Sequence, residues 1–258
     1  MELWRFIDSG PSPGSENMRL DEELAVRFLE GSGAPTLRVF QWNPWAISLG
    51  HYQRIEEIDV DRCSANGIDV VRRPTGGRAI LHAEELTYSI VMNSGGKNVT
   101  EVYNNIGRAL LEGLRLFGVE ANLQRAQPDF VQRYRRPSSI PCFSSSARYE
   151  IEWGGRKLVG SAQRRYMNNH RTVILQHGSI LCGPAHLRLA EYIRGDGQEF
   201  RDEIRRDLLE RTVCLQEILG GRVDVNLLAR SLKQGFETSW GISFNNADTH
   251  LQRRTAHG

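Results

Sequence analysis

The stretch ARYEIEWGGRKLVGSAQRR, residues 147–165, carries the clearest β-hairpin pattern of the chain. Gly154 and Gly155 stand together between two runs with strand character, and such a pair is typical of a two-residue hairpin turn. The run TVILQHGSIL, residues 172–181, predicts another strand directly afterwards. Strands that follow one another this closely favour antiparallel pairing, because a parallel connection needs a crossover of about a dozen residues or more.

The segments before the hairpin mix strands and helices without a strict βαβ order. Strands are predicted at TLRVFQW (36–42), WAISLG (45–50, after the Asn43–Pro44 turn), DVVRR (69–73) and ELTYSIVM (85–92). One helix is predicted to begin at Asn17 as its cap and to stop at Gly31. A short helix is expected within residues 55–67, and a long amphipathic helix over residues 99–117.

The C-terminal part, from about His186, has charged sequence with helical periodicity. Its expected apolar contacts are Ile204, Leu208, Leu209, Val213 and Leu215, and a last helix is expected after the cap residue Asp224. The predicted fold class is α/β (α+β), with mixed, largely antiparallel sheets flanked by helices. We expect a main domain at residues 1–220, with its core at about 32–218, and a helical appendix at 221–258.

Composition indicates a globular chain without an obvious polyanionic or membrane partner. Hydrophobic residues make up 40% of the 258 residues and charged residues 25%, and the net charge of +2 favours neither nucleic acid nor a membrane surface. No secretory signal pattern and no apolar run of membrane-spanning length occurs, so a cytoplasmic location is expected. The four cysteines lack CxxC spacing, which predicts free thiols and no metal site. Only three of the 33 basic residues are lysines (Lys97, Lys157 and Lys233), so a retained lysine suggests a need for an amine.

The stretch RRPTGGRAILH, residues 72–82, combines two adjacent glycines with three arginines. It matches neither GxGxxG nor GxxxxGK[ST], and it lies between two strands instead of opening a long helix, which argues against a nucleotide loop of either kind. A tight turn with solvated arginines is the alternative interpretation.

A second group of candidates surrounds the hairpin. Cys142 follows a proline, and Lys157 comes fifteen residues later, on the strand face expected to hold Val159 and Ser161. A nearby cation stabilises a thiolate, so Lys157 would activate Cys142 if the loop folds back over the hairpin. A buried inert thiol and a solvent-facing lysine are the simpler alternatives. His177 stands next to Gly178 and Ser179, but without a placed acid it is a poor hydrolase triad.

Six segments, taken in order, resemble the biotin/lipoate protein ligase and octanoyltransferase superfamily, over about Trp4 to Leu181. They are NMRLDEELA, WNPWAISLGHYQ, RRPTGGRAILH, ELTYSIV, GRKLVGSAQRR and QHGSIL. Cys142-Phe143 is followed by Tyr149-Glu150 ahead of the strand that holds Lys157. This pattern is similar to that of octanoyltransferases of the LipM type. The TGGR of the glycine stretch points the same way, since ligases tend to have a third glycine at Arg78.

The resemblance implies a ligase-like catalytic fold, an acyl tunnel near the glycines, and two catalytic residues, Cys142 and Lys157. The substrate-binding residues that it implies are Arg73, Gly76, Gly77, Arg78, His82, Gly160, Ser161, Ala162, Gln163 and His177. Arg72, Arg73 and the basic run at residues 133–136 are further expected to meet a phosphopantetheine phosphate and an acidic carrier protein.

The activity implied is octanoyl transfer from octanoyl-acyl carrier protein to a lysine of a lipoyl domain, such as glycine cleavage H protein, through a cysteine thioester. No cofactor is expected, because a thioester is already activated. The alternatives are an ATP-dependent lipoate or octanoate ligase, an amidotransferase between lipoyl domains, and a non-catalytic acyl binder.

Overall fold

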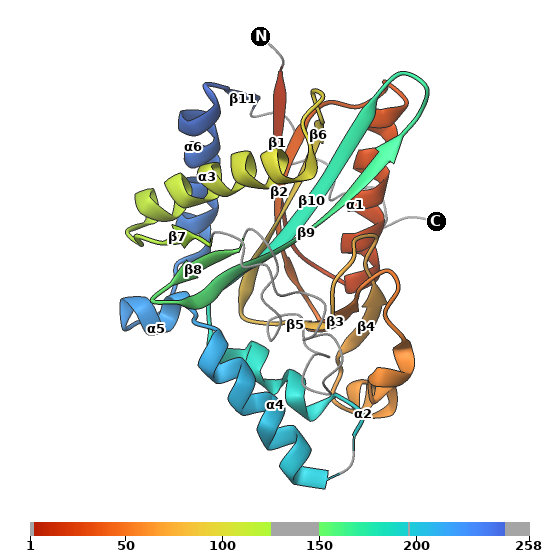
Figure 1. Ribbon diagram of the computed structural model, residues 1–258, viewed down its shortest axis with the longest axis vertical. Coiled ribbons are helices and arrows are strands. Elements are labelled where there is room, and N and C mark those ends of the chain that lie inside the picture. Colours follow the sequence, from red (N-terminus) through yellow and green to blue (C-terminus); the bar gives the residue numbers. More distant parts are fainter. Residues whose placement is uncertain (1–2, 125–149, 196, 246–258) are drawn as a thin grey trace, which may run out of the picture.

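A computed structural model describes residues 3–124, 150–195 and 197–245. Its main sheet has eight strands in the order β11-β1-β2-β6-β10-β9-β8-β7 (Figure 1). These strands are β1 (Trp4–Ser12), β2 (Thr36–Trp42), β6 (Glu85–Asn93), β7 (Asn122–Leu123), β8 (Ile151–Trp153), β9 (Arg156–Met167), β10 (Thr172–Leu181) and β11 (Phe244–Asn245). Within the described part of this sheet, only the pairs β1–β11 and β1–β2 are parallel, so the predicted mixed, largely antiparallel sheet is confirmed.

A second sheet of three strands lies beside the first. It has the order β4-β3-β5, built from β3 (Ala46–Leu49), β4 (Asp69–Arg72) and β5 (Ile80–His82). Strand β5 falls inside the glycine-containing stretch, where no strand had been predicted. The glycines therefore connect two strands of this small sheet.

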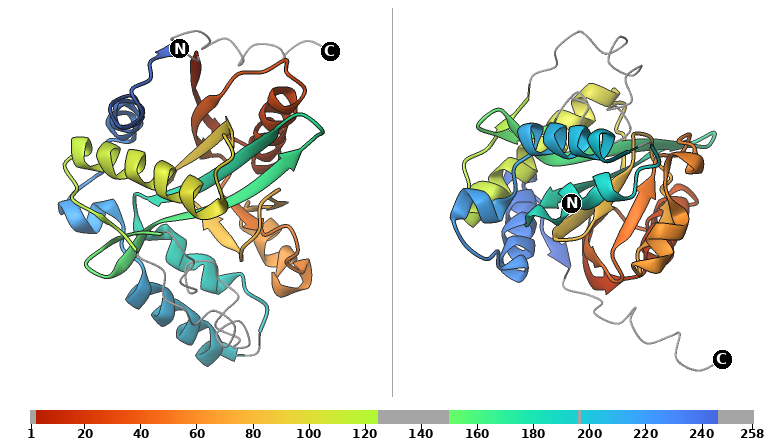
Figure 2. Two further views of the ribbon diagram at one scale, coloured as in Figure 1. Left: turned by 45° about the horizontal axis from the view of Figure 1, so that its top comes forward. Right: turned by 90° about the horizontal axis from the view of Figure 1, so that it is seen from below.

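Helices cover both faces of the main sheet. The helices of the described residues are α1 (Gly14–Leu29), α2 (Val60–Ala65), α3 (Val99–Phe117), α4 (Gly197–Arg211), α5 (Leu215–Leu219) and α6 (Val225–Trp240), with 3-10 turns at Ile55–Glu57 and Pro184–Glu191. Helix α1 packs on one side of the sheet, and α3 and α6 pack together on the other (Figure 1). Helix α4 lies against the turn at Pro184–Glu191, at the end of the molecule that also holds α2 (Figure 2).

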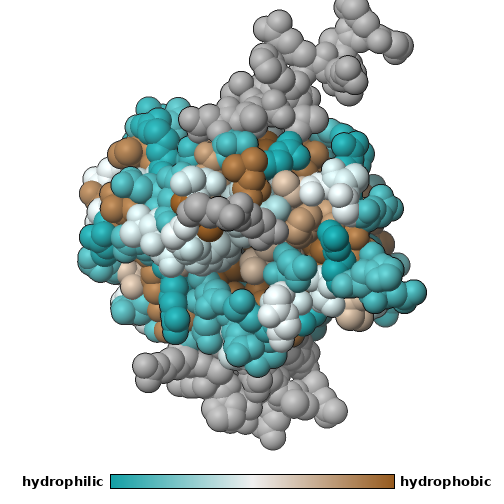
Figure 3. Space-filling model, turned by 90° about the horizontal axis from the view of Figure 1, so that it is seen from above, coloured by the Kyte–Doolittle hydropathy of each residue, from teal (hydrophilic) through white to brown (hydrophobic). Residues whose placement is uncertain are grey.

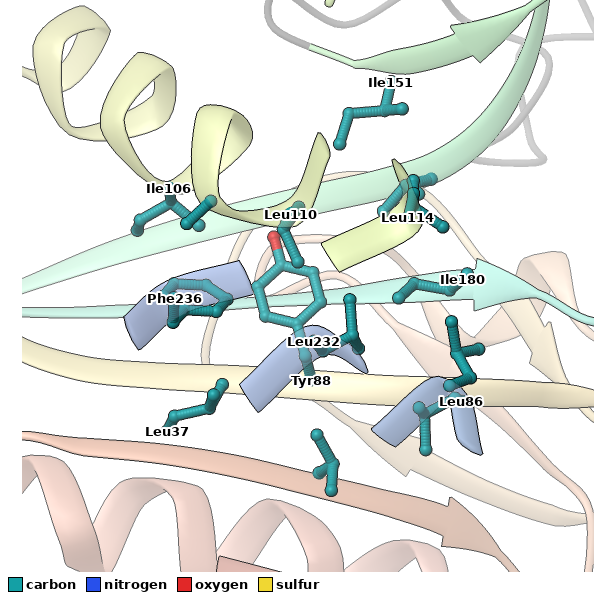
Figure 4. Close-up of a cluster of buried hydrophobic side chains, with 14 of the residues drawn as sticks. Leu37, Leu86, Tyr88, Ile106, Leu110, Leu114, Ile151, Ile180, Leu232 and Phe236 are labelled. Atoms are coloured by element: carbon teal, nitrogen blue, oxygen red, sulfur yellow. The ribbon is translucent and has the colours of Figure 1, made fainter. Parts of the chain in front are cut away.

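The alternation of side chains along β6 explains how two different cores form on one strand. Leu86, Tyr88 and Ile90 join the largest hydrophobic cluster, which includes residues of α3 and α6. Figure 4 shows Tyr88 surrounded by residues from these two helices and from the sheet. Val91 instead belongs to the cluster with α1, and Ser89 bonds to Asp21 of α1. Successive side chains of a strand point to opposite faces, so the polar odd-numbered residues of β6 are directed to the α1 side.

Helix α3 shows why the strongest sequence prediction is correct. Its predicted bounds, residues 99–117, are those observed, and Val102, Ile106, Leu110 and Leu114 are buried. Asn98 caps its first turn in a capping box with Glu101. The predicted Asp224 cap of α6 is also confirmed, since its carboxylate accepts a hydrogen bond from the Leu227 amide.

Two sequence predictions are wrong. Asn17 does not cap α1, because the helix begins at Gly14; the Asn17 side chain is buried and donates to the Ser12 and Gln41 carbonyls. Leu209 is 54% exposed, whereas the other expected contacts, Ile204, Leu208, Val213 and Leu215, are buried. Strand β1 was also missed, because Gly10 and Pro11 interrupt its apolar pattern.

Polar residues predominate on one face of the molecule. The face in Figure 3 is largely hydrophilic, with smaller hydrophobic areas between. None of the helices in the described ranges has the length and hydropathy needed to cross a bilayer.

Candidate active site

A small cavity, of about 20 Å³, brings together residues from distant parts of the chain. It is lined by Met18, Trp42, Ser48, Arg73, Ile80, His82, Thr87, Gly160, Ser161, Ala162, His177, Gly178 and Ser179. Six predicted site residues are among them: Arg73, His82, Gly160, Ser161, Ala162 and His177. A concave, largely apolar pocket with a few convergent polar groups is the usual form of a small-molecule site.

The glycine loop, defined here as residues 74–78, lies next to this cavity and is held by Arg73. Arg73 is 3% exposed. Its five N–H donors reach the Ser48 carbonyl and hydroxyl and the Gly76 and Arg78 carbonyls, at 2.7–3.1 Å. The interpretation with solvated arginines is therefore wrong for Arg73. Its expected contact with a phosphate is also contradicted, because the protein itself takes up the guanidinium donors.

Arg72 and Arg78 have different surroundings. Arg72 is exposed, and its Nη1 donates to the carbonyls of Gly50, His51 and Gln53 at 2.7–3.0 Å. Arg78 forms an ion pair with Glu57 at 3.7 Å. Gly76 and Gly77 are exposed, and Gly77 has a φ of 99° that favours glycine.

His177 is buried between an acid and a hydroxyl. Its Nδ1 lies 3.1 Å from Asp21 Oδ2, and its Nε2 lies 2.6 Å from Thr75 Oγ1. Burial lowers the pKa of His177, and the opposing effect of Asp21 does not reverse the shift. Burial alone would raise the pKa of Asp21, but Arg38 and His177 outweigh it, so the carboxyl pKa is lowered.

His82, which also lines the cavity, has an analogous environment. Its Nδ1 lies 2.8 Å from Glu85 Oε1, and its Nε2 lies 2.7 Å from Ser48 Oγ. Its ring stacks on Trp42, with centroids 4.0 Å apart. Burial would raise the pKa of Glu85, yet His82 and the other hydrogen-bond donors outweigh it and lower that pKa.

Lys157 lies on β9, the strand that continues to Gly160, Ser161 and Ala162 in the cavity wall. It is 6% exposed, so the interpretation as a solvent-facing strand residue is wrong. Its Nζ donates to the buried carboxylate of Glu150 in a very short contact. Its backbone carbonyl accepts from the Val213 amide, which joins β9 to the end of α4.

The remaining predicted residues fall outside this arrangement. Gln163 follows Ala162 on β9 and donates to Gln176 Oε1 at 3.1 Å. Cys142 and the basic run at residues 133–136 lie outside the described residues. Within those residues, no group of three or more His, Cys, Asp or Glu side chains is arranged to hold a metal ion.

The cysteines that are described are poor nucleophiles. Burial raises the pKa of Cys63 to about 11 and that of Cys182 to about 12, and it also raises the pKa of Cys214. All three are free and buried. A thiol with a raised pKa carries little thiolate near neutrality, which is the reactive form.

Several polar residues around the cavity were not found from the sequence. Asp21, Arg38, Glu85, Ser48 and Thr75 all bond to a predicted site residue or to one of its partners. Asp21 showed one available signal: it is a polar residue three positions before Leu24, on the apolar face of its helix.

Comparison with known proteins identifies relatives of this chain. A family model described as the lipoyl protein ligase A/B catalytic domain matches residues 13–237. The octanoyltransferase LipM of Kyrpidia tusciae is 38% identical over 99% of this chain and 94% of its own length. That of Bacillus subtilis is 36% identical over 93% of this chain and 87% of its own.

Solved structures agree on the fold. A bipartite lipoate protein ligase from Thermoplasma acidophilum superposes with a TM-score of 0.72 at 21% identity, covering 95% of this chain and 86% of that one. A lipoate-protein ligase A bound with ATP gives 0.71 at 24% identity, covering 95% and 88%. The matched family model spans most of the chain and the relatives share more than a third of its residues, so the chain belongs to the lipoyl protein ligase A/B catalytic domain family.

Proposed function

We propose that this chain is an octanoyltransferase of protein lipoylation that works through a thioester on Cys142. The observation that carries the activity is its full-length similarity to proteins named octanoyltransferase LipM, at 33–38% identity across eight relatives. The similarity to ligase structures is below 25% and concerns the fold alone. Arg78, in place of a third glycine, also favours the transferase over the ATP-dependent ligase.

In the first step, the Cys142 thiolate attacks the carbonyl carbon of an octanoyl thioester on acyl carrier protein. A carbon–sulfur bond forms, the bond to the carrier sulfur breaks, and the carrier leaves as a thiol after taking up a proton. This exchange of one thioester for another is nearly isoenergetic and needs no nucleotide. The raised pKa values of Cys63 and Cys182 support Cys142 as the nucleophile by disfavouring those two thiols.

In the second step, the ε-amine of a lysine on a lipoyl domain attacks the octanoyl-enzyme. An amide forms, and the Cys142 thiol is released. Glycine cleavage H protein is one acceptor of the right kind. Lys157 donates a hydrogen bond to the carbonyl oxygen as it becomes an oxyanion, and one such donor is worth about 3 kcal/mol. The buried position of Lys157 on the cavity strand supports this role, because a donor in a water-poor site acts more strongly.

The cavity would hold the octanoyl chain. Gly160, Ser161 and Ala162 line it on β9 with little side-chain bulk, so an alkyl chain that widens the cavity would meet few obstacles there. The exposed Arg72 and the basic run at residues 133–136 would attract the acidic surface of a carrier, mainly by raising the encounter rate.

Intact-mass analysis tests the proposal. Enzyme incubated with octanoyl-acyl carrier protein, without ATP and without acceptor, is expected to gain one octanoyl group. Cys142→Ser should abolish the gain, whereas the matched control Cys214→Ser should keep it. A gain that persists in Cys142→Ser would refute the assignment of the nucleophile.

The same assay separates the alternatives. Octanoyl transfer from free octanoate that depends on ATP would indicate a ligase. Acylation of the enzyme by an octanoylated lipoyl domain, but not by octanoyl carrier protein, would indicate the amidotransferase. If no turnover occurred with any acyl donor, the non-catalytic acyl binder would be the remaining interpretation.

A further inference from the structure

The glycine loop is fixed through its carbonyl groups. Four of its five carbonyls accept hydrogen bonds: Pro74 from Arg164, Thr75 from the His51 amide, and Gly76 and Arg78 from Arg73. The fifth, that of Gly77, packs on Gly50, where an added Cβ would lie 1.9 Å from the Gly77 oxygen. The position of the loop therefore depends on Arg73 and on the contacts of Thr75.

Two chains of hydrogen bonds, here called relays, lead from a buried carboxylate to the glycine loop. The first relay consists of Asp21, His177 and Thr75. The ionised Asp21 carboxylate can only accept, so His177 carries its proton on Nδ1 and donates it to Asp21 Oδ2 at 3.1 Å. Nε2 of the neutral ring then has a free lone pair, which accepts the Thr75 hydroxyl at 2.6 Å. The side chain of the loop residue Thr75 is in this way bonded to strand β10.

The second relay consists of Glu85, His82, Ser48 and Arg73. His82 Nδ1 lies 2.8 Å from Glu85 Oε1, and its Nε2 is hydrogen-bonded to Ser48 Oγ at 2.7 Å. The same Ser48 Oγ accepts a hydrogen bond from Arg73 Nη1 at 3.0 Å, because a guanidinium can only donate. Arg73 in turn holds the loop through the Gly76 and Arg78 carbonyls.

We propose that His177 and His82 are positioning residues that hold the glycine loop against the cavity through these two relays. Each relay starts at a buried carboxylate on one element and ends at the loop. Both histidines line the same cavity and are linked to the same loop. The inference deepens the proposed function and rests on it for the identity of the ligand.

Acid, histidine and hydroxyl in series also resemble a hydrolase triad, but the hydroxyls do not fit that role. Thr75 is 1% exposed and Ser48 is fully buried. Ser48 Oγ is further engaged by Arg73. A nucleophile must reach its substrate, so these two hydroxyls serve as fixed links.

Holding the loop has a consequence for binding. The C=O and N–H of a trans peptide point in opposite directions. Carbonyls of Thr75 and Gly76 held by the protein therefore turn the amides of Gly76 and Gly77 to the exposed side of the loop. Among the residues that the structure describes, none accepts a hydrogen bond from these two amides. A fixed loop keeps both amide N–H groups aligned to bind the acyl substrate, whereas a loose loop does not.

The test compares Thr75→Val, which removes the hydroxyl at nearly constant volume, with Thr75→Ser, which retains it. The first readout is hydrogen exchange of the His51 amide by NMR, because this amide donates to the Thr75 carbonyl and reports detachment of the loop. Thr75→Val should speed this exchange about tenfold, the factor expected for one lost hydrogen bond. Amides in the middle of β10 should exchange at the wild-type rate.

The second readout is steady-state kinetics with octanoyl-acyl carrier protein. Thr75→Val should raise KM about tenfold and leave kcat within about threefold, because alignment of the donor is lost and the reacting groups are intact. Thr75→Ser should restore both values. Ser48→Ala should give the same pattern through the second relay.

The matched control is Thr36→Val. It removes a buried hydroxyl that donates to the Ala34 carbonyl at 2.9 Å, outside both relays and the loop. It should lower the unfolding midpoint but leave His51 exchange and KM unchanged.

The inference is refuted if Thr75→Val leaves His51 exchange and KM as in wild type, or if Thr75→Ser is as impaired as Thr75→Val. It is also refuted if Thr75→Val speeds exchange equally throughout β10, which would mean general loss of stability. Failure of the proposed function has a different outcome: wild type would form no octanoyl-enzyme, whereas the exchange measurement would still report on the relays. Cys142→Ser should lose the octanoyl adduct and keep wild-type exchange at His51.

Discussion

Replacing Glu150 by glutamine should destabilise the protein strongly, because it leaves a buried ammonium without its carboxylate. Lys157 and Glu150 are 6% and 3% exposed and in direct contact. Removing one partner of a buried ion pair typically costs about 3–5 kcal/mol, since the remaining charge stays away from water. The substitution keeps the size and shape of the side chain, so packing changes contribute little.

Urea denaturation followed by tryptophan fluorescence measures this cost as a shift in the unfolding midpoint. A double-mutant cycle with Lys157→Met isolates the pair. Each single variant should lose stability, and the double variant should lose clearly less than the sum, because no charge is then left buried. The control Glu112→Gln removes the ion-pair partner of the exposed Arg115 on α3 and should not shift the midpoint measurably. Additive effects in the cycle, or a Glu150→Gln variant as stable as the control, would refute the reasoning.

Three further predictions concern other parts of the molecule. Burial lowers the pKa of His186 from 6.5 to about 4, so the folded state stays neutral while the unfolded state gains a proton, and stability should fall by up to about 3 kcal/mol as the pH drops from 6.5 to 4. The unfolding free energy of His186→Gln measured over this range should show a shallower slope, and an unchanged slope would contradict the assignment. Gly235→Ala should lower the unfolding free energy by about 1–3 kcal/mol, because the new Cβ would lie 2.3 Å from the Gly113 amide nitrogen where α3 and α6 meet; Gly221→Ala, with open space around it, serves as the control. Asn98→Ala removes the cap of α3 and should cost about 1 kcal/mol in thermal or urea unfolding, whereas Asn98→Asp should recover most of it.

The site combines residues that function in different ways. In the proposed function Lys157 donates to the acyl carbonyl, whereas His177, His82 and Arg73 hold other protein groups in place. This division would separate the binding of the acyl chain from its transfer. Substitutions in the relays are therefore expected to act on KM, and substitutions of Cys142 or Lys157 on kcat.

Local sequence determined the elements whose signals lie within a few residues. The hairpin around Gly154-Gly155 and helix α3 with its Gly118 end follow from turn chemistry and periodicity, and both were predicted correctly. The glycine stretch could be separated from a nucleotide loop by its position between strands. Six of the predicted binding residues also proved to line one cavity.

Tertiary structure alone decided what those residues contact. Asp21 and His177 are 156 positions apart, and Thr75 and His177 are 102 apart, so no local pattern links them. Arg73 is buried because β3 and the glycine loop surround it with carbonyl oxygens, although an arginine beside glycines favours a solvated or anion-binding interpretation. Asn17 lies within the first turn of α1 because the Ser12 and Gln41 carbonyls bind its amide there. Hydrogen bonds of a buried side chain depend on which strands and helices become neighbours, and only the folded chain determines that.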